Sequence, residues 1–560
     1  MFVPVPTPEE MSRWDAEAIA LGMAEDVLME NAARCAMDSL REHLYSRGVS
    51  LSGASVLLLA GSGNNGGDAF CMARHLLDAG ACPILVCTRR PDAYRGAASR
   101  WLRAAIDLGV PVFSAEEWES GASAIPTRFN IAVDGLLGTG FHGALREREQ
   151  RLVHKFNSLS TPFVLAVDIP SGLDARTGRP CPVAVHAHVT VSFQAAKPGL
   201  LLPEAETFTG LLDVRPIGMP RRVQEENRPS FRTWLLPAQL KSDRASAYSL
   251  ARRPTARTFD LLSCPASAPP SWDGPAHKGD AGRVLVIGGC SDYAGAPCLA
   301  GLGALCSGAG LVTVAGPESV LDAVRASMPE LTTQSIPRLS GYAAPEWSAE
   351  AAASLVPALS AAKAVVFGPG LGRSEGAADF AEALLSLPHR PPMVLDADAL
   401  FALASRPHLL KALRPCDVLT PHPGEAATLL GISAARVQED RFAALDALAA
   451  LAPAVWVLKG AGTLIAVPDE PSVISPWDVP QLAVAGSGDV LAGAVGTFLA
   501  QGHTAGTAAA LGVWLHALAG ISLSPHFPMR GNSPQHIAHA LPSVLAALGI
   551  PSRGESCPSF

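Results

Sequence analysis

The stretch from Val484 to Gly493 combines a glycine-rich turn with a carboxylate at the start of an amphipathic helix. Backbone N–H groups in the first turn of a helix lack intrahelical partners, and together with the helix dipole they favour an anion such as a phosphate. Asp489 could take a proton from a substrate hydroxyl as that hydroxyl attacks a phosphoryl group held by the same N–H groups. The alternative is an ordinary helix start, in which Asp489 only complements the dipole.

Other loops in the C-terminal half carry charged or hydroxyl side chains where short apolar runs end. Lys459 opens a glycine turn that ends at Thr463, and its cation, N–H groups and hydroxyl suit nucleotide phosphates or ribose. The other loops are Gly368–Gly372, Asp396–Asp398 and Thr420–Glu425. His422 lies between two prolines, where it either contacts a ligand or is a surface loop residue. The sequence contains no GxxxxGK[ST] pattern, which excludes a P-loop enzyme.

The N-terminal half has its own glycine turn, Gly61–Asp68, between an apolar run and a helical pattern. Its GxGxxG spacing in this context fits a dinucleotide site. It differs from a dehydrogenase fingerprint, because Thr88–Arg90 stands where an acidic residue would bind the ribose. The paired asparagines and Asp68 also supply more polar groups than a pyrophosphate turn needs. The turn therefore indicates a specialised pocket.

Two more carboxylates, Asp134 and Asp168, end apolar runs in this half. Because ligands of open parallel sheets bind beyond the carboxyl ends of the strands, we expect these loops and the asparagine turn to meet at one crevice. Oxygen atoms of Asn65, Asp134 and Ser171 could bind a hard cation. Each Asp could instead be a helix cap or a turn former. Lys197 could be an acid/base partner, but a solvated surface lysine is the simpler interpretation.

Two α/β domains would position these loops. Apolar runs at 56–60, 83–87, 131–134, 163–168 and 189–193 alternate with helical segments, which predicts a mostly parallel sheet covered on both faces. A second series comprises 283–289, 364–367, 392–395, 417–420 and 455–458. Between them the periodicity fails and Pro, Ser, Ala and Arg dominate. We therefore expect domains at 1–220 and 277–560, joined by a linker at 221–276.

The bulk composition limits the partners and the compartment. The chain of 560 residues has a formal net charge of -8 without long runs of either sign, so we expect no nucleic-acid and no membrane-surface partner. The 11 cysteines are scattered without a CxxC pair, which argues against a disulfide framework or a structural zinc site and favours the cytoplasm. We identify no signal peptide and no uninterrupted apolar run of about 18 residues, so a spanning helix is not expected. We expect a homo-oligomer, although the sequence does not reveal the number of copies.

Four motifs in the N-terminal half resemble the YjeF N-terminal domain, the NAD(P)H-hydrate epimerase family: GSGNNGGD, DGLLGTG, VDIPSGLDARTG and TVSFQAAKPGL. The resemblance covers roughly Met11 to Pro220 and implies a Rossmann-like three-layer sandwich that interconverts the R and S forms of hydrated NAD(P)H. It implies that the substrate is held by Asn64, Asn65, Gly66, Gly67, Asp68, Gly138, Thr139, Gly140, Phe141, His142, Gly143, Ala144 and Asp168. It also implies potassium at Asn65, Asp134 and Ser171, and we assign acid/base work to Asp168. Ala69 stands where the family usually has a glycine, which narrows the room beside the turn.

The C-terminal half is similar to the NAD(P)H-hydrate dehydratase family, which has a ribokinase-like fold. The similarity spans His277 to Ile550 and includes HKGDAGRVLVIGG, YAGAP, GAGLVTVA, GPGLG, DADAL, TPHPGE, KGAGT and GSGDVLAG. It implies that Ala296, Gly370, His422 and Asp489 contact the hydrate, and that Lys459, Gly460, Ala461, Gly462, Thr463 and Gly488 contact the adenine nucleotide. Asp489 is the implied catalytic base. Ser487 replaces the commoner threonine but retains its hydroxyl.

The two resemblances together imply a bifunctional metabolite-repair enzyme. The first domain would resupply the S epimer of hydrated NADH or NADPH, and the second would dehydrate it using Mg²⁺ and ADP, giving AMP and phosphate. Fused bacterial forms favour ADP over ATP, although the sequence does not decide between them, nor whether the two sites pass substrate directly. One alternative is a ribokinase-type small-molecule kinase, which would leave a stable phosphorylated product. Another treats the N-terminal half as a binding module without catalysis.

Overall fold

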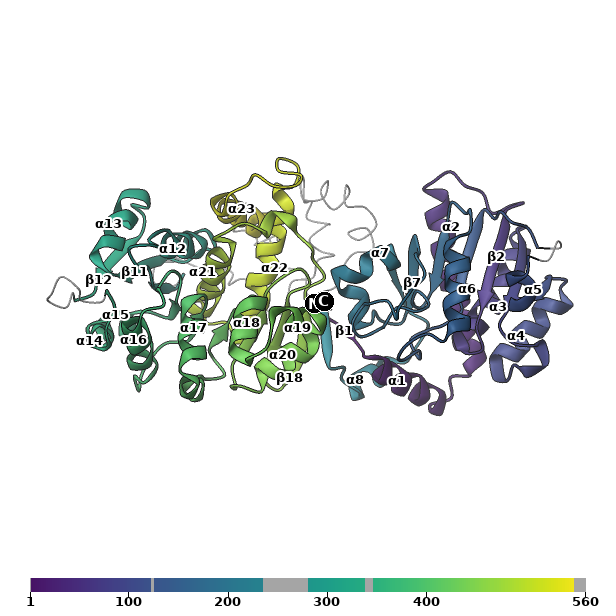
Figure 1. Ribbon diagram of the computed structural model, residues 1–560, viewed down its shortest axis with the longest axis horizontal. Helices are drawn as coiled ribbons and strands as arrows, with labels where there is room; N and C mark the ends of the chain where they lie inside the picture. The colour runs from purple at the N-terminus through teal and green to yellow at the C-terminus, as the bar shows by residue number, and fades with distance from the viewer. Residues whose placement is uncertain (1, 122–124, 235–280, 338–345, 548–560) are drawn as a thin grey trace, which may run out of the picture. The chain divides into compact units, whose positions relative to one another are not determined.

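The computed structural model describes residues 2–121, 125–234, 281–337 and 346–547, which divide into two compact units (Figure 1). The described residues of Val3–Arg232 form the first unit. Phe2, Thr233, Trp234 and the described residues from 281 onward form the second. The first part of the predicted linker contains α8 (Arg221–Glu226) and β9 (Phe231–Trp234). The rest of that linker, 235–276, and the start of the second predicted domain, 277–280, lie outside the described residues.

The first unit is built on a seven-stranded sheet in the order β4-β3-β2-β5-β6-β7-β8, and every neighbouring pair in it is parallel. Its strands are β2 (Ser55–Ala60), β3 (Cys82–Cys87), β4 (Val112–Ser114), β5 (Ile131–Gly135), β6 (Val164–Val167), β7 (Val189–Phe193) and β8 (Leu211–Arg215). The strand order reverses at β2 and β5, and an open parallel sheet has its ligand crevice at such a point.

Helices cover both faces of this sheet, which confirms the predicted three-layer α/β sandwich. Along β2, Val56, Leu58 and Ala60 pack in one core cluster, whereas Leu57 and Leu59 pack in the other, because successive side chains of a strand point to opposite faces. The first cluster includes residues of α2 (Glu25–Tyr45), α3 (Asn64–Asp78) and α4 (Gly96–Asp107). The second includes residues of α5 (Ala115–Glu119) and α6 (Glu147–Asn157). The remaining elements are α1 (Pro8–Ala20), η1 (Pro91–Ala93), η2 (Pro198–Leu201), η3 (Pro203–Ala205) and α7 (Glu206–Thr209).

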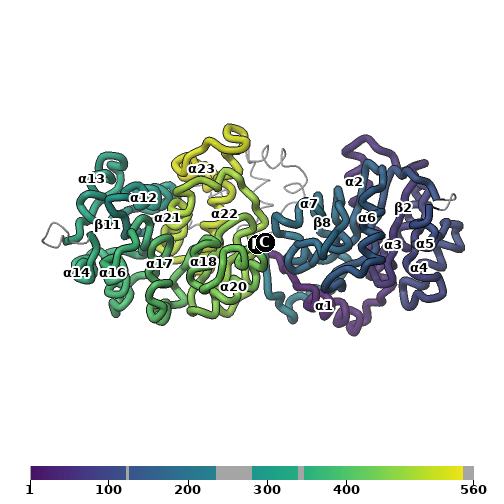
Figure 2. Tube along the Cα trace, viewed as in Figure 1, coloured from purple at the N-terminus to yellow at the C-terminus, as the bar shows by residue number. Residues whose placement is uncertain are grey.

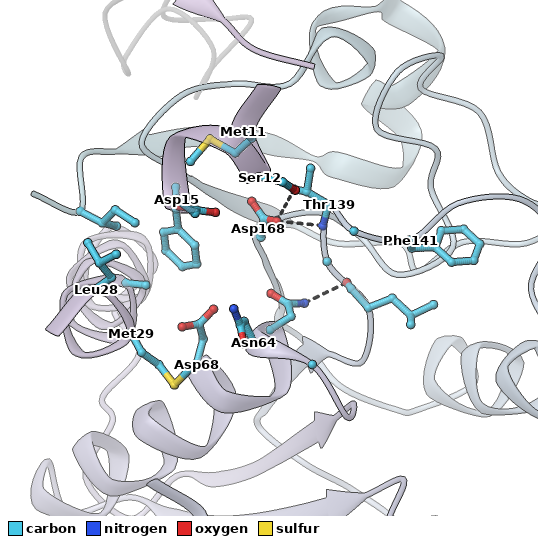
Figure 3. Close-up of a pocket in the computed structure, with 18 of the residues that line it drawn as sticks. Met11, Ser12, Asp15, Leu28, Met29, Asn64, Asp68, Thr139, Phe141 and Asp168 are labelled. Carbon is cyan, nitrogen blue, oxygen red and sulfur yellow. Dashed lines mark hydrogen bonds between the residues drawn. The ribbon is translucent and has the colours of Figure 1, made fainter. Parts of the chain in front are cut away.

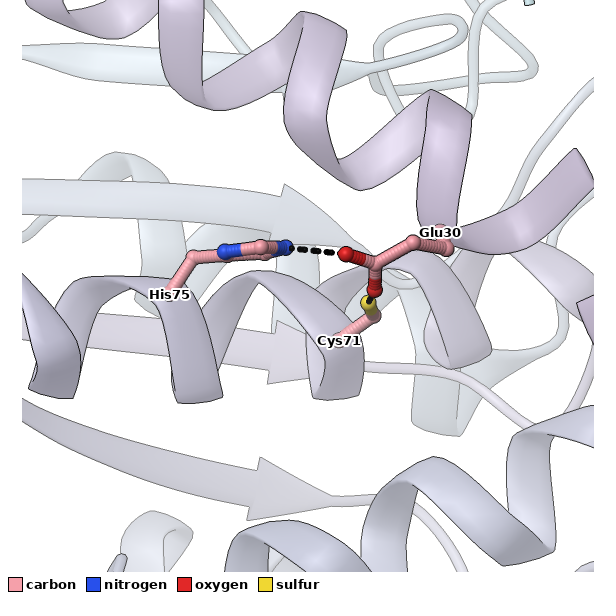
Figure 4. A group of neighbouring side chains, drawn as sticks. All are labelled: Glu30, Cys71 and His75. Atoms are coloured by element: carbon pink, nitrogen blue, oxygen red, sulfur yellow. Dashed lines mark hydrogen bonds and ion pairs between the residues drawn. The ribbon is translucent and has the colours of Figure 1, made fainter. Parts of the chain in front are cut away.

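A polar cluster links α2 to α3 beside this core. The Glu30 carboxylate on α2 accepts a hydrogen bond from the Cys71 thiol at 2.9 Å and lies 3.0 Å from His75 Nε2 (Figure 4). Arg74 Nη2 lies 2.8 Å from both Glu30 oxygens and 2.9 Å from His75 Nε2. Since the guanidinium already supplies the positive charge between these groups, the cluster is complete as an ion-pair network that fixes α3 against α2.

The larger sheet has eleven strands in the order β1-β9-β18-β17-β16-β15-β14-β13-β10-β11-β12; β10 to β18 belong to the second unit, whereas the unit boundary falls within β1 and β9. Its central strands are parallel, whereas β16-β17-β18 is antiparallel. Besides β9, the strands are β1 (Phe2–Val5), β10 (Arg283–Ile287), β11 (Leu311–Gly316), β12 (Thr332–Ser335), β13 (Ala364–Phe367), β14 (Met393–Leu395), β15 (Val418–Leu419), β16 (Val455–Leu458), β17 (Leu464–Val467) and β18 (Glu470–Ile474). The parallel strands of the predicted second series, 283–289 through 455–458, are confirmed.

Three apolar helices form the buried centre of the second unit: α12 (Gly295–Cys306), α21 (Ser487–Ala500) and α22 (Ala505–Leu523). Helix α21 packs against both α12 and α22 (Figure 2). Gly493 permits its contact with α12, because a Cβ there would stand 2.0 Å from the carbonyl oxygen of Ala300. The other helices are α13 (Glu318–Ser327), α14 (Ala349–Ser354), α15 (Val356–Ala361), α16 (Glu375–Leu385), α17 (Asp398–Ser405), η4 (Pro407–Ala412), α18 (Pro423–Leu430), α19 (Ala434–Glu439), α20 (Arg441–Ala449), η5 (Pro480–Leu482) and α23 (Pro534–Ala547).

Among the described residues, α22 is the one helix that is long and apolar enough to cross a membrane. The sequence did not predict it, because polar residues and glycines interrupt its apolar run. In the structure 78% of its most apolar window is buried. Burial of this extent is what a core helix of a globular domain shows, and length with composition is weak evidence of a span.

Candidate active sites

The first site is a cavity of about 460 Å³ at the carboxyl ends of the central strands of the first unit. It brings together, as the sequence predicted, the asparagine turn, the loop after β5 and the loop after β6. Its lining includes Asn64, Asn65, Asp68, Gly138, Thr139, Gly140, Phe141 and Asp168 of the predicted substrate-binding set. Figure 3 shows Asp68 and Asn64 on one side of this space and Asp168 with Thr139 on another.

Five predicted substrate residues do not line this cavity. Gly66 and Gly67 are buried in the first turn of α3, where a Cβ on Gly66 would stand 2.1 Å from the carbonyl oxygen of Gly61. Gly66 therefore allows the tight turn rather than touching the space. His142, Gly143 and Ala144 are exposed on the loop after Phe141 and lie outside the lining.

Asp168 is held in one position by its backbone and by three donors. Its φ of 64° lies in the left-handed region, which non-glycine residues rarely adopt and which often marks a functional site. Its carboxylate accepts hydrogen bonds from Lys197 Nζ at 2.6 Å, from the Thr139 amide at 3.0 Å and from the Thr139 hydroxyl. Burial would raise the pKa of Asp168, but the Lys197 charge and these hydrogen bonds outweigh it and lower that pKa. Asp168 is therefore an ionised group.

Lys197 is not the solvated surface residue that the sequence interpretation favoured. Its side chain is 1% exposed, and besides Asp168 its ammonium donates to the Ser192 hydroxyl at 3.0 Å and to the Phe193 carbonyl at 3.2 Å. The earlier interpretation was wrong because Ala196-Lys197-Pro198-Gly199 looks like an exposed turn, whereas the segment folds over the sheet and buries it. Lys197 lines the cavity with Asp168.

The predicted cation ligands Asn65, Asp134 and Ser171 are adjacent and buried. The Ser171 hydroxyl donates to Asp134 Oδ1 at 2.6 Å, and the Ser171 amide donates to Asp134 Oδ2 at 2.7 Å. Asn65 Nδ2 donates to the Leu137 carbonyl at 2.8 Å, which leaves Asn65 Oδ1 buried without a hydrogen-bond partner among the described residues. Burial raises the pKa of Asp134 to about 6 despite these bonds. An orphaned amide oxygen beside a buried carboxyl fits a hard monovalent cation.

The sequence interpretation missed Asp15, which lies on α1 and lines the same cavity. Burial, followed by the charge of Asp168, raises its pKa to about 6 although Lys197 opposes the shift. The segment around it reads as an amphipathic helix with several acidic residues, so nothing in the sequence separates Asp15 from Glu9, Glu10 or Glu17. Only the packing of α1 against α8 and the segment after β7 does so.

The second site begins at the glycine turn before α21. Gly486 adopts φ of 87°, and this left-handed residue directs the N-terminus of α21 toward the carboxyl ends of β14 and β16. A Cβ on Gly488 would stand 3.3 Å from Lys459 Nζ and 3.7 Å from Asp396 Oδ2. The turn and the lysine-bearing loop therefore adjoin, as the sequence predicted.

Around that lysine lies a group of carboxylates from successive strand ends. Lys459 Nζ donates to Asp396 Oδ1 at 2.6 Å and lies 3.8 Å from Glu425 Oε2. Burial, followed by the charge of Asp396, raises the pKa of Asp489 to about 8, although Lys459 opposes the shift. Burial likewise raises the pKa of Glu425 to about 7. Asp489 is thus a carboxyl that changes charge near neutral pH, as a general base requires.

A cavity of about 400 Å³ adjoins this group. Its lining contains His422 and the predicted nucleotide residues Lys459, Gly460, Ala461, Thr463 and Gly488, whereas Gly462 is buried behind the turn. It also contains His516, which the sequence interpretation missed because it lies in the apolar α22. His516 Nε2 is 3.1 Å from the Ser487 hydroxyl, and burial lowers the pKa of His516 to about 4, so the ring is neutral.

Asp489, Ala296 and Gly370 do not line that cavity. Gly370 and Ala296 adjoin each other, since a Cβ on Gly370 would stand 3.1 Å from the Ala296 Cβ. Asp398 accepts a hydrogen bond from the Gly372 amide at 3.0 Å and also raises the pKa of Asp489 after larger effects of burial and Asp396. The predicted hydrate residues thus lie along one edge of the sheet, with His422 on the nucleotide side.

Fold and sites together define a bifunctional α/β enzyme, with a pocket lined by carboxyls and a buried lysine on a parallel sheet in one unit and a glycine turn beside a titratable carboxylate in the other. Residues 25–199 match the YjeF-related protein N-terminus family, and residues 284–543 match the NAD(P)H-hydrate dehydratase family. A bifunctional NAD(P)H-hydrate repair enzyme Nnr from Moorella thermoacetica is 35% identical over 97% of this chain and 96% of its own length. The enzyme of the same name from Escherichia coli is 35% identical over 85% of this chain and 82% of its own.

The chain belongs to the family of bifunctional NAD(P)H-hydrate repair enzymes. Among solved structures, the Bacillus subtilis ADP/ATP-dependent NAD(P)H-hydrate dehydratase co-crystallised with ATP and Mg²⁺ is 27% identical. It covers 52% of this chain and 97% of its own length, with a TM-score of 0.42.

Proposed function

We propose that this protein repairs hydrated NADH and NADPH in two linked reactions. The first unit interconverts the R and S hydrates, and the second dehydrates the S form. The observation that carries the proposal is that one chain of this family holds both sites intact, with Asp168 and Lys197 paired in one and Asp489 beside Lys459 and Asp396 in the other.

In the second unit, Asp489 is the proposed general base that removes the proton from the ring hydroxyl of the hydrate. The hydroxyl oxygen attacks the terminal phosphoryl group of ADP, and AMP leaves as the P–O bond to it breaks. The lone pair of the ring nitrogen then expels phosphate and forms a C=N⁺ bond, and loss of a proton from the neighbouring ring carbon restores the reduced nicotinamide. In this proposal the nucleotide is held by Lys459, Gly460, Ala461, Gly462, Thr463 and Gly488. The hydrate is contacted by Ala296, Gly370 and His422. Mg²⁺ bound with ADP would neutralise phosphate charge.

In the first unit, the paired Asp168 carboxylate and Lys197 ammonium lie together beside the space that receives the hydrated ring. Asn64, Asn65, Asp68 and Gly138–Phe141 line the space that receives it. Asn65, Asp134 and Ser171 would hold K⁺, which supplies a fixed positive charge beneath the asparagine turn. We assign to Asp168 an acid/base role in which it acts as the ionised partner.

The remaining parts of the proposal concern partners and location. The partners are small molecules, namely the hydrates and a nucleoside diphosphate, with no nucleic acid and no membrane. We propose that the protein is a homo-oligomer and that it lies in the cytoplasm. Light scattering of the purified protein would test the oligomeric state.

The test incubates purified protein with mixed epimers of hydrated NADH, K⁺, Mg²⁺ and either ADP or ATP, and follows the return of reduced-nicotinamide absorbance. Complete recovery of both epimers supports the two linked activities. If only the S fraction is recovered, the first unit has no epimerase activity. If a stable phosphorylated product accumulates, the second unit is a kinase and not a dehydratase. The faster of the two nucleotides identifies the donor.

A further inference from the structure

Four carboxyl groups line the cavity of the first unit, namely Asp15, Glu25, Asp68 and Asp168, and the three aspartates differ in their partners. Asp168 accepts the hydrogen bonds from Lys197 and Thr139 described above. Asp15 and Asp68 accept no side-chain hydrogen bond and form no ion pair with a described residue, although both line the cavity. Their oxygen atoms are therefore available to a ligand.

Asp15 and Asp68 come from different elements. Asp15 projects from α1, and Asp68 projects from the first turns of α3. In Figure 3 they extend toward the same space, with Asp15 drawn near Asp168 and Asp68 drawn on the other side of the space beside Asn64. A flat ring between α1 and α3 would therefore present one face to each carboxyl.

Burial and neighbouring charges favour the protonated forms of Asp15 and Asp68. Burial, followed by the charges of Asp168 and then Asp15, raises the pKa of Asp68 well above its usual value. For Asp15, Lys197 is the one cation that opposes the shift, while burial and Asp168 favour it. Asp168 stays ionised because Lys197 and Thr139 hold its charge. Burial, reinforced by the charge of Asp168, thus keeps two neighbouring carboxyls ready to carry a proton.

We propose that Asp15 and Asp68 form the proton-exchanging pair of the epimerase, one on each face of the hydrated ring. This inference rests on the proposed function of the first unit. The protonated member donates its proton to the ring hydroxyl; the C–O bond breaks, its electron pair leaves with the oxygen as water, and the ring nitrogen lone pair forms a C=N⁺ bond. Water then adds to the opposite face, and the other carboxylate takes the proton that this water loses. The pair exchanges roles in the reverse reaction, so no proton or redox equivalent is consumed.

Fixed negative charge at Asp168 has a role in this scheme. In this scheme the acid/base role assigned above to Asp168 becomes an electrostatic one: its ionised carboxylate stabilises the transient iminium cation, while Asp15 and Asp68 transfer the protons. Epimerisation then needs three carboxyls with two different tasks, which explains why they share one cavity while only one of them has a lysine partner.

The experiment measures conversion of purified R hydrate to S hydrate by chromatography without nucleotide, so that the second unit cannot consume the product. We compare the full-length protein with its Asp15→Asn, Asp68→Asn and Asp15→Glu variants. Each amide variant is expected to lose at least about 100-fold in kcat, as loss of a general acid or base typically does, with a smaller effect on KM. Asp15→Glu should recover part of kcat, because it restores a carboxyl group.

Glu17→Gln is the matched control, since Glu17 lies on the same helix but does not line the cavity. It should keep the wild-type rate. The wild-type pH profile should rise and then fall, as one acid and one base require, and Asp15→Asn should lose one limb of it. If Asp15→Asn keeps more than half of the wild-type kcat with both limbs, the pair is refuted. If the wild-type protein itself does not accelerate epimerisation, the proposed function fails instead.

Unfolding of the Asn variants would also remove activity, so near-ultraviolet circular dichroism is recorded for each. If an amide variant is unfolded, the decision passes to Asp15→Glu, whose longer side chain moves the carboxyl. A folded Asp15→Glu protein with an unchanged kcat and an unchanged pH profile would overturn the role of Asp15, whereas a lower kcat with a displaced limb would support it.

Discussion

Dehydration by the second unit should depend steeply on pH, because Asp489 must lose its proton before it can act as a base. Burial and the nearby Asp396 raise the pKa of Asp489 to about 8. A carboxyl with a raised pKa is protonated below that value and ionised above it. With this pKa, about one-eleventh of the protein carries the ionised base at pH 7 and about ten-elevenths at pH 9, so activity limited by Asp489 should rise about tenfold.

The assay is the initial rate of absorbance recovery with purified S hydrate and MgADP, both well below saturation. Under these conditions the rate reports the free enzyme, and the nucleotide phosphates, with a second pKa of about 6, are already ionised above pH 7. Asp489→Asn should be at least about 100-fold slower at every pH. Glu439→Gln, an exposed residue of α19, serves as the control and should change nothing.

A second variant makes the reasoning sharper. The charge of Glu425 contributes to the raised pKa of Asp489, after burial and Asp396. Glu425→Gln should therefore move the rise in rate to lower pH. A flat rate between pH 7 and pH 9 in the wild-type protein, or an active Asp489→Asn protein, would refute Asp489 as the base.

Three more predictions concern the first unit. Asp168→Asn should abolish epimerisation but not dehydration. It should also reduce the free energy of unfolding of this unit by about 3 to 5 kcal/mol, because Lys197 is left buried and unpaired. Adding Lys197→Met should restore part of that stability in urea unfolding, and no recovery would contradict the argument. K⁺ should raise the melting temperature more at pH 8 than at pH 5, since Asp134, with a pKa raised to about 6, binds a cation only when ionised; Asn65→Ala should remove this difference, and an equal K⁺ effect at both pH values would disprove the site. Gly66→Ala should destabilise the unit by about 1 to 3 kcal/mol, as overpacking does, because its Cβ would meet the Gly61 carbonyl oxygen at 2.1 Å; unchanged chemical denaturation would show that the turn relaxes.

Sequence patterns predicted most of the parallel strands, because a strand buried on both faces appears as a continuous apolar run, as in Val56–Ala60. They missed the parallel strands β4, β8 and β11. They did not predict β12 (Thr332–Ser335), whose four residues are polar and mostly exposed. Nor did they predict β17 and β18, which pair as an antiparallel extension beyond β16. Edge strands depend on the neighbour they pair with, and that information is not local in the sequence.

The site residues divide in a similar way. Asp134, Asp168 and Asp489 could be found because each sits at a strand end or helix start, where backbone geometry itself creates a binding position. Asp15 and His516 could not, since each lies within a helix whose pattern explains it without a ligand. Their proximity to the sites arises from tertiary packing of α1 and α22, which no local spacing encodes.

The order of strands at one edge of the larger sheet determines whether the C-terminal half can be expressed as a separate fragment. Strands β1 and β9 lie outside β18, although β1 belongs to the first residues of the chain. A C-terminal fragment beginning at His277 would lack both strands and would expose the backbone amides and carbonyls of β18 as a new sheet border. Bare borders of this kind recruit strands from other molecules, so such a fragment should aggregate through β18, a contact that β9 blocks in the intact polypeptide.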